Sequence, residues 1–237
     1  KNDAMQRDDW YETARDPAEL PAPETVGRRA GERAMRRLGA RKIATTQVPV
    51  LFEASIAASL LGHFASAVSG GNLYRKSSFL LDSAGKLIFA PFVRISDLPH
   101  IKKGLASSAF DEEGVATQPR EVVRDGVVQG YFLGSYSARK LGLKSTGNAG
   151  GNHNLILHDT GEDFAGLIKK MGTGLLVTEL MGQGVNPVTG DYSRGAVGYW
   201  VERGEIAYPV QEITVAGNLK DLFRGMAAVG NDVIRRG

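Results

Sequence analysis

The sequence contains no cysteine among its 237 residues, which excludes disulfide bonds and thiolate metal ligands. No stretch approaches 18 consecutive apolar residues, so no membrane-spanning helix is predicted. A charged segment followed by an apolar one, as in a secretory signal peptide, is not recognisable either. These absences fit a reducing compartment, and we expect a cytoplasmic location without membrane contact.

Charge of either sign is moderate, with a net charge of +3 and a pI near 9.1. The cations gather in one segment, 28–42, where a basic helix could contact nucleic acid electrostatically. No aromatic residue stands between them to stack with bases, so a solvated helix face is the simpler interpretation. The cations concerned are Arg28, Arg29, Arg33, Arg36, Arg37, Arg41 and Lys42.

Glycine is the abundant residue, with 30 copies or roughly twice its usual share. The glycines stand between short β-branched runs, which indicates many tight turns and a strand-rich architecture. Strands are predicted at 79–81, 86–93, 120–124, 127–133, 154–157, 175–180, 195–201 and 205–215. Helices are predicted at 24–38, 53–68, 163–171 and 219–229, the second ended by glycine in a left-handed conformation at 70–71.

Successive hairpins with few helices favour an α+β fold with a mainly antiparallel sheet. The Asp125-Gly126 pair is the strongest local signal, because a type I′ turn needs positive φ at both positions. Residues 1–23 are polar and contain three prolines, so we expect them to be an entry segment from an upstream domain. Residues 24–237 then form the α+β domain.

The segment 48–78 reads VPVLFEASIAASLLGHFASAVSGGNLYRKSS, an extended entry followed by a helix, a double glycine and a basic loop. It resembles the metal-binding helix of the TldD/PmbA family, once called modulators of DNA gyrase. In the TldD branch this helix carries His-Glu-x-x-x-His. Here Glu53 is retained, while Phe52 and Ala57 stand at the two histidine positions.

The residues at the two histidine positions determine whether zinc chemistry is predicted for this chain. In a zinc peptidase, two histidines bind the metal and the glutamate takes a proton from the metal-bound water. Phenylalanine and alanine have no ligand atom, so Glu53 remains a catalytic candidate only in a degenerate motif, and a structural role near a helix N-terminus is simpler. The four histidines have no pair with ligand spacing: His63, His100, His153 and His158. We therefore expect no metal and no other cofactor in this chain.

Three further segments carry the same resemblance: EVVRDGVVQGY at 121–131, MGQGVNPVTGDY at 181–192 and ERGEIAYPV at 202–210. With 135–140 and 147–154, the resemblance extends from Gln6 to the last residue. The degenerate helix indicates the PmbA (TldE) branch. The implied fold is the C-terminal domain of a longer protein.

The resemblance implies a peptidase complex in which a TldD-like subunit holds zinc. This chain would be its metal-free, non-catalytic partner, in a heterodimer or as a homodimer. The complex would degrade unfolded or short peptides and trim leaders from peptide antibiotics, with peptides paired to strand edges. Candidates for the substrate path are the loop residues and one turn residue, Asn148, Gly150, Gly151, Asn152 and Asn186.

Alternatives remain open. The glycine-rich loop 147–152 lacks the ending of a phosphate loop and is more simply a flexible connection before a strand. A DNA- or gyrase-modulating protein acting through 28–42 is the main functional alternative, although nucleic acid is the less expected partner. A metal-independent hydrolase using Glu53 with another group is the third. Whether the chain alone is an enzyme stays undecided.

Overall fold

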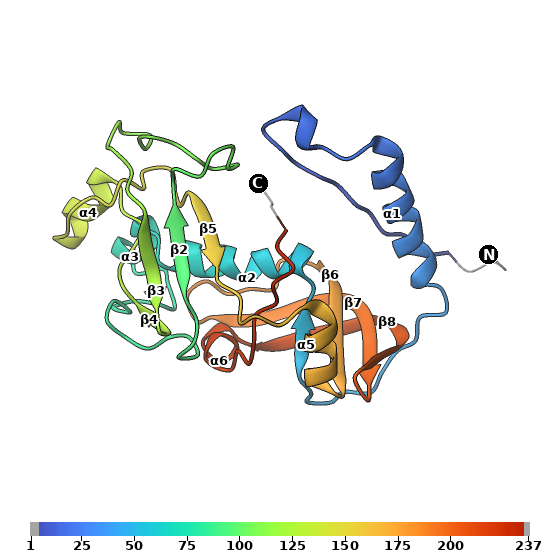
Figure 1. Cartoon of the computed structure of the whole chain (residues 1–237). Coiled ribbons are helices and arrows are strands. Elements are labelled where there is room, and N and C mark those ends of the chain that lie inside the picture. The colour runs from blue at the N-terminus through green and yellow to red at the C-terminus, as the bar shows by residue number, and fades with distance from the viewer. Residues whose placement is uncertain (1–4, 235–237) are drawn as a thin grey trace.

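The computed structural model describes residues 5–234, which form two four-stranded sheets on either side of a central helix (Figure 1). The predicted entry segment and domain also include residues 1–4 and 235–237, which lie outside the described residues. Both sheets are antiparallel except at one edge of the first, and helices lie among the strands rather than alternating with them. The predicted α+β class with mainly antiparallel sheets is confirmed.

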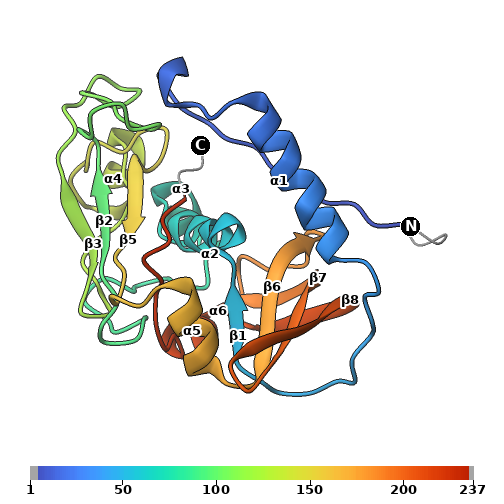
Figure 2. The same cartoon turned by 45° about the vertical axis from the view of Figure 1, so that its right-hand side comes forward.

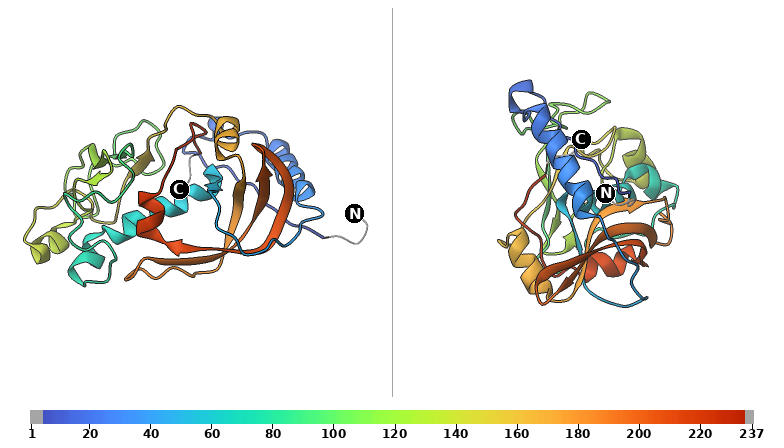
Figure 3. Two further views of the ribbon diagram at one scale, coloured as in Figure 1. Left: turned by 90° about the horizontal axis from the view of Figure 1, so that it is seen from below. Right: turned by 90° about the vertical axis from the view of Figure 1, so that its right-hand side faces the viewer.

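The first sheet has the order β1-β6-β7-β8, and only β1 and β6 are parallel. Its strands β7 and β8 are long and strongly curved (Figure 3). They are joined across the tight turn Arg203-Gly204, where both residues have positive φ. The strands are β1 (Val50–Phe52), β6 (Gly174–Met181), β7 (Asp191–Glu202) and β8 (Glu205–Asn218).

The second sheet has the order β4-β3-β2-β5 and is antiparallel throughout. The predicted turn between β3 and β4 is confirmed, with φ of 50° at Asp125 and 75° at Gly126. A side chain at Gly126 would lie 2.6 Å from the carbonyl oxygen of Phe89, so glycine is also needed for space. The strands are β2 (Ile95–Leu98), β3 (Arg120–Arg124), β4 (Val127–Val128) and β5 (Asn154–Leu157).

Seven helical segments complete the described chain: η1 (Pro17–Glu19), α1 (Pro23–Arg36), α2 (Ala54–Ala67), α3 (Gly70–Tyr74), α4 (Ser135–Leu141), α5 (Phe164–Met171) and α6 (Leu219–Arg224). Helix α2 passes between the second sheet and α1, which stand on opposite sides of it (Figure 2). Its apolar stripe faces the main core, where Phe64 and Val68 are fully buried. Phe89 and Phe223 stack there, with ring centroids 4.6 Å apart.

Residues 79–81 and 86–93 do not form the predicted hairpin but turns, with a single bridge at Leu87. Their backbone amides bond to distant segments instead of to each other. Phe79 donates to the carbonyl of Pro187, and Ala90 donates to that of Phe223. The strand prediction was wrong because tertiary partners replaced the local ladder.

Three boundaries also differ from the predictions. Gly70 is not a left-handed cap but the first residue of α3, and a side chain there would lie 2.3 Å from Ser137 Oγ. The strand predicted over 127–133 ends at Val128, because the Phe132 amide donates to Val68 at the end of α2. The last predicted helix ends at Arg224. Strand β2 and helix α4 were not predicted.

Candidate functional site

Glu53 lies where β1 ends and α2 begins, as the N-cap residue of α2. Its backbone amide donates to the carbonyl of Val177 at 2.9 Å and so continues the pairing of β1 with β6. Its Oε1 and Oε2 lie 2.8 and 3.1 Å from Nη1 of Arg33, and the Ser55 hydroxyl donates to Oε2 at 2.5 Å. Both carboxylate oxygens are therefore engaged within the chain.

Arg33 belongs to an ion-pair network that fastens α1 to the first sheet. Its Nε donates to Asp8 Oδ1 at 3.1 Å. Arg37, one helical turn later, contacts Asp8 at 3.5 Å and Glu179 of β6 at 2.6 Å. The Arg37 and Asp8 side chains are only 5% and 8% exposed. We call these five residues the α1 network: Asp8, Arg33, Arg37, Glu53 and Glu179.

The α1 network stabilises the charged form of Arg33. Burial opposes the charge of Arg33, but hydrogen bonds and charge from Glu53 and then Asp8 outweigh it and raise the pKa of Arg33. Arg33 therefore carries a permanent positive charge next to the motif glutamate.

The positions of the motif do not suit a zinc ion. Phe52 packs against the core from β1, and Ala57 on α2 has no ligand atom. His63 lies farther along α2, with Nε2 buried and without a hydrogen-bond partner in the described chain. Within residues 5–234, no three histidine, aspartate or glutamate side chains are placed to hold a metal. No step through a metal can be built on these side chains.

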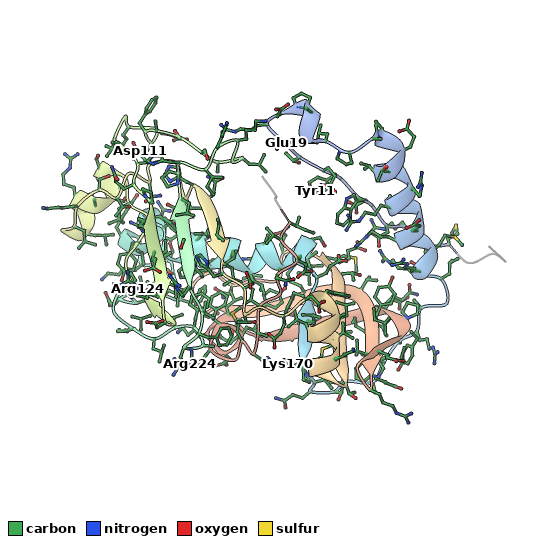
Figure 4. The ribbon with its side chains drawn as sticks, viewed as in Figure 1. Tyr11, Glu19, Asp111, Arg124, Lys170 and Arg224 are labelled. Carbon is green, nitrogen blue, oxygen red and sulfur yellow. The ribbon has the colours of Figure 1, made fainter. Side chains whose placement is uncertain are left out.

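Two clefts flank Glu53. One, of about 370 Å³, is lined by Glu53, Arg33 and aromatic side chains of the first sheet such as Tyr199. Another, of about 630 Å³, lies between Glu53, the segment around Trp10 and the last described residues. Figure 4 shows Tyr11 of the same N-terminal segment in the space between α1 and α2. Glu53 thus lies on the wall shared by two solvent-accessible spaces.

A third cleft, of about 270 Å³, follows the edge of β6. Strand β1 ends at Phe52, opposite Val177, so Thr178–Met181 of β6 pairs only with β7 among the described strands. The cleft is lined by Thr178, Glu179 and Leu180 of β6, by Ser55 and Ser59 of α2, and by the N-terminal residues 8–11. This part of β6 presents an unpaired strand edge to the cleft.

The comparisons with known proteins identify the family. A model of the PmbA/TldA metallopeptidase C-terminal domain matches residues 45–237. This chain belongs to that family. It is 53% identical to metalloprotease PmbA of Escherichia coli O157:H7, over all of this chain and 52% of that protein. It is 50% identical to the PmbA homologue of Haemophilus influenzae, over 99% of this chain and 52% of that protein.

The solved structures agree with this assignment. A protein of Thermotoga maritima, described as a modulator of DNA gyrase, has a TM-score of 0.88 and 40% identity, over 94% of this chain and 53% of its own. One of Bacteroides thetaiotaomicron, described in the same way, has a TM-score of 0.89 and 33% identity, over 94% and 50%. The TldE structure of Thermococcus kodakarensis, at 24% identity and a TM-score of 0.76, supports the fold alone.

The family resemblance inferred from the motifs is confirmed, and the chain spans about half the length of the curated relatives it matches. None of the helices within residues 5–234 combines the length and apolar character that a membrane span needs. The division at residue 23 stays a prediction, although α1 begins at Pro23.

The predicted substrate-path residues of loop 147–152 lie beside the second sheet. Asn148 is buried, and its Nδ2 donates to Asp97 Oδ2 at 2.9 Å and to the carbonyl of Gly151. Gly150 and Gly151 both have positive φ, and Asn152 donates to the carbonyl of its neighbour His153. The loop is thus held by hydrogen bonds within it and to Asp97 and Asp111, and none of its residues lines the clefts described above.

Asn186 occupies a turn between β6 and β7. Its Oδ1 accepts from the backbone amides of Val188 at 2.9 Å and Thr189 at 3.3 Å. The structure therefore does not bring Asn186 or the loop 147–152 together with Glu53. Their role in a substrate path stays a prediction.

The basic segment 28–42 is largely engaged within the molecule. Arg33 and Arg37 belong to the α1 network, and Lys42 pairs with Glu212. The guanidinium of Arg29 lies 3.5 Å from the ring centroid of Trp10, and that of Arg41 lies 4.0 Å from the centroid of Tyr208. Most of these cations are therefore not arranged as a free surface for phosphates.

Sequence reasoning missed the partners of Glu53. Arg33 and Arg37 are four residues apart, which places them on one face of α1, and this spacing was a readable signal of a shared role. That the face contacts Asp8, Glu53 and Glu179 depends on the fold, and no local pattern predicts it.

Proposed function

We propose that this chain is the metal-free, non-catalytic component of a PmbA/TldD-type metalloprotease in the cytoplasm. It pairs with a zinc-carrying TldD-like subunit or, where none is present, with a second copy. The complex degrades unfolded or short peptides and trims peptide leaders. The family membership supports peptide hydrolysis as the process in which the chain takes part.

One observation carries the non-catalytic assignment. The motif glutamate, Glu53, has both carboxylate oxygens within hydrogen-bond distance of Arg33 Nη1, and Oε2 also accepts from the Ser55 hydroxyl, which fits a structural ion pair with α1. The neighbouring motif positions, Phe52 and Ala57, offer no atom that could bind a metal and so activate a water molecule. With these residues at the motif positions, the chain contributes a binding surface and does not itself hydrolyse peptide bonds.

The proposed peptide-binding surface is the open edge of β6. An extended peptide can add a strand to an unpaired edge through main-chain hydrogen bonds, which explains how varied sequences would be accepted. The segment Thr178–Met181 has this unpaired edge, and the cleft beside it has both polar and apolar walls.

The deciding experiment measures zinc content and peptidase activity of the full chain, alone and mixed with a TldD-like subunit. We expect substoichiometric zinc and no cleavage of an unfolded peptide by the chain alone, and chelator-sensitive cleavage by the mixture. Chelator-sensitive cleavage by this chain alone would overturn the proposal.

A matched pair of variants locates the chemistry. Glu53→Gln keeps the size and the hydrogen-bond acceptor beside Arg33, so the mixture should retain its activity. The same substitution in the His-Glu-x-x-x-His motif of the TldD-like subunit should abolish it. Loss of activity with Glu53→Gln, in a mixture that still assembles, would instead favour a hydrolytic role for Glu53.

A further inference from the structure

One face of the first sheet is only partly covered by helices. Leu176 of β6 lies opposite Tyr199 of β7, which in turn lies opposite Pro209 of β8. Residues paired in this way point to the same side of a sheet, so the three side chains form one row. Helix α5 packs on this side through Ile168 and Phe164. Phe164 is the first residue of α5 and lines the part of the face that α5 leaves open.

This open part is the floor of the cleft of about 370 Å³ beside Glu53, which we call the sheet cleft. Its apolar lining consists mainly of Phe164, Leu176, Tyr199, Ile206 and Pro209. Ile206 is 47% exposed, although it lies opposite the fully buried Val201. A sheet face in contact with water normally carries polar side chains, so this apolar row indicates a surface that binds something.

Helix α1 lies across the sheet cleft from this floor but adds no apolar cover. It contains no buried residue, and none of its residues belongs to the apolar clusters of the described chain. Its contributions to the lining are Arg33 and Arg36, and the N-terminal segment adds Asp8. The sheet cleft therefore has an apolar floor and a charged opposite wall.

The charges that line the sheet cleft balance one another. Its two carboxylates, Asp8 and Glu53, both pair with Arg33. Arg36 is the second guanidinium, and no ion pair or hydrogen bond engages it within residues 5–234. Burial, and then the charge of Asp8, raises the pKa of Tyr199, so the floor is neutral. Because burying an unpaired charge is costly, a lining without net charge favours a neutral occupant.

An aromatic ring suits this lining better than other neutral groups. Phe164 and Tyr199 offer ring edges and faces against which a third ring can pack. Arg36 can place its guanidinium over the face of such a ring, because the face is electron-rich. The chain makes the same contact elsewhere, where the guanidinium of Arg29 lies 3.5 Å from the ring centroid of Trp10.

The sheet cleft adjoins the open edge of β6. Both it and the cleft along that edge are lined by Asp8, Arg33 and Thr178. Side chains of a strand added to a sheet alternate between the two faces. A peptide paired with Thr178–Met181 would therefore direct every second side chain toward the side of the sheet on which the sheet cleft lies.

We propose that the sheet cleft binds an aromatic side chain of a peptide paired with the open edge of β6, with the ring between Tyr199 and Arg36. The proposal rests on the proposed function, since it adds a side-chain preference to the same peptide-binding surface. The apolar floor attracts any apolar side chain, whereas Arg36 attracts only a ring. Arg36 is thus the residue that sets the preference for aromatic over aliphatic side chains.

The test is a calorimetric or NMR titration of the full chain with four acetylated tripeptide amides. Their outer residues are alanine, and the central one is alanine, leucine, phenylalanine or glutamate. We expect the phenylalanine peptide to bind at least about tenfold more tightly than trialanine, the leucine peptide to lie between them, and the glutamate peptide to show no gain.

The outcomes separate this proposal from the proposed function. Equal affinity for all four peptides, or a leucine peptide that binds as tightly as the phenylalanine peptide, overturns the aromatic site but leaves peptide binding intact. No binding of any peptide contradicts both proposals. Cleavage by the mixture with a TldD-like subunit tests the proposed function separately.

Variants at two exposed positions assign the preference to the sheet cleft. Arg36→Gln should weaken binding of the phenylalanine peptide severalfold and leave the leucine peptide unchanged. Ile206→Ser should weaken both, because it removes part of the apolar lining. Trialanine should bind each variant as before. The matched controls Arg28→Gln and Val188→Ser lie at exposed positions that line none of the three clefts, and they should change nothing.

Both variants should fold, because they replace exposed side chains. An undiminished preference for phenylalanine in folded Arg36→Gln and Ile206→Ser proteins would place the ring outside the sheet cleft and overturn the site.

Discussion

Replacing Arg33 by methionine tests whether the α1 network fixes the N-terminal helix and Glu53. Methionine keeps much of the aliphatic volume of arginine but removes the guanidinium that joins Glu53 and Asp8. Both carboxylates would then remain partly buried without this partner. We therefore expect Arg33→Met to destabilise the protein strongly, although α1 contains no buried residue.

The magnitude follows from burial. Removing one partner of a buried ion pair costs about 3–5 kcal/mol, whereas an exposed pair contributes about 0–1 kcal/mol. The side chains of Arg33, Asp8 and Glu53 are 16%, 8% and 22% exposed, much nearer the buried case. We therefore expect a loss of about 3 kcal/mol, which corresponds to a fall in Tm of about 6–12 °C for a chain of this length.

Urea unfolding and thermal melts followed by circular dichroism measure this loss. The matched control is Arg28→Met, an exposed arginine earlier on α1, which should change stability by less than about 0.5 kcal/mol. A double-mutant cycle with Glu53→Gln should show a coupling energy of about 1–3 kcal/mol. Equal losses of stability in Arg33→Met and Arg28→Met, or no coupling energy with Glu53→Gln, would refute the argument that the α1 network stabilises the fold through buried ion pairs.

Three further predictions concern stability. Gly198→Ala should destabilise the protein by at least about 3 kcal/mol or prevent folding, because the added Cβ would lie 1.8 Å from the carbonyl oxygen of Leu176. Gly62→Ala, at an open position inside α2, should instead stabilise by about 0.5–1 kcal/mol in the same urea assay. Asp111 lies in the loops beyond the second sheet (Figure 4). Burial opposes its ionisation, but hydrogen bonds from three backbone amides outweigh burial and lower the pKa of Asp111. The charged Asp111 therefore stabilises the folded protein fully above about pH 4, and this stabilisation is lost as the pH falls through the lowered pKa. Urea unfolding at a series of acidic pH values should show that Asp111→Asn lowers the free energy of unfolding less and less as the pH falls.

The parts of the fold that were predictable are those encoded over a few residues. Asp125-Gly126 predicts a type I′ turn because both residues tolerate positive φ, and the apolar stripe of α2 follows from side chains three or four residues apart. The segment 79–93 failed for the opposite reason. Its β-branched and aromatic residues fit a strand, but its amides bond to Pro187 and Phe223, far along the chain.

The candidate site divides in the same way. Glu53, with its two altered neighbours, could be read from one hexapeptide, because the chemistry of a zinc motif is local in sequence. Its partner Arg33 lies twenty residues earlier, and Asp8 and Glu179 are farther still. Such sites are assembled by topology, so spacing rules do not reveal them.

Under the proposed metal-free role, the barrier to zinc at this place comes from α1 as well as from the hexapeptide 52–57. Two unit charges 4 Å apart interact by about 4 kcal/mol at an effective dielectric constant of 20, so a divalent ion near the Arg33 guanidinium would meet roughly twice that repulsion. Because Arg33 lies 2.8 Å from the carboxylate that would face the ion, histidines restored at positions 52 and 57 would still form a site next to a fixed positive charge. Helix α1 thus opposes a metal at the same place where Phe52 and Ala57 offer no ligand, and zinc binding there would require changes in α1 as well as at these two positions.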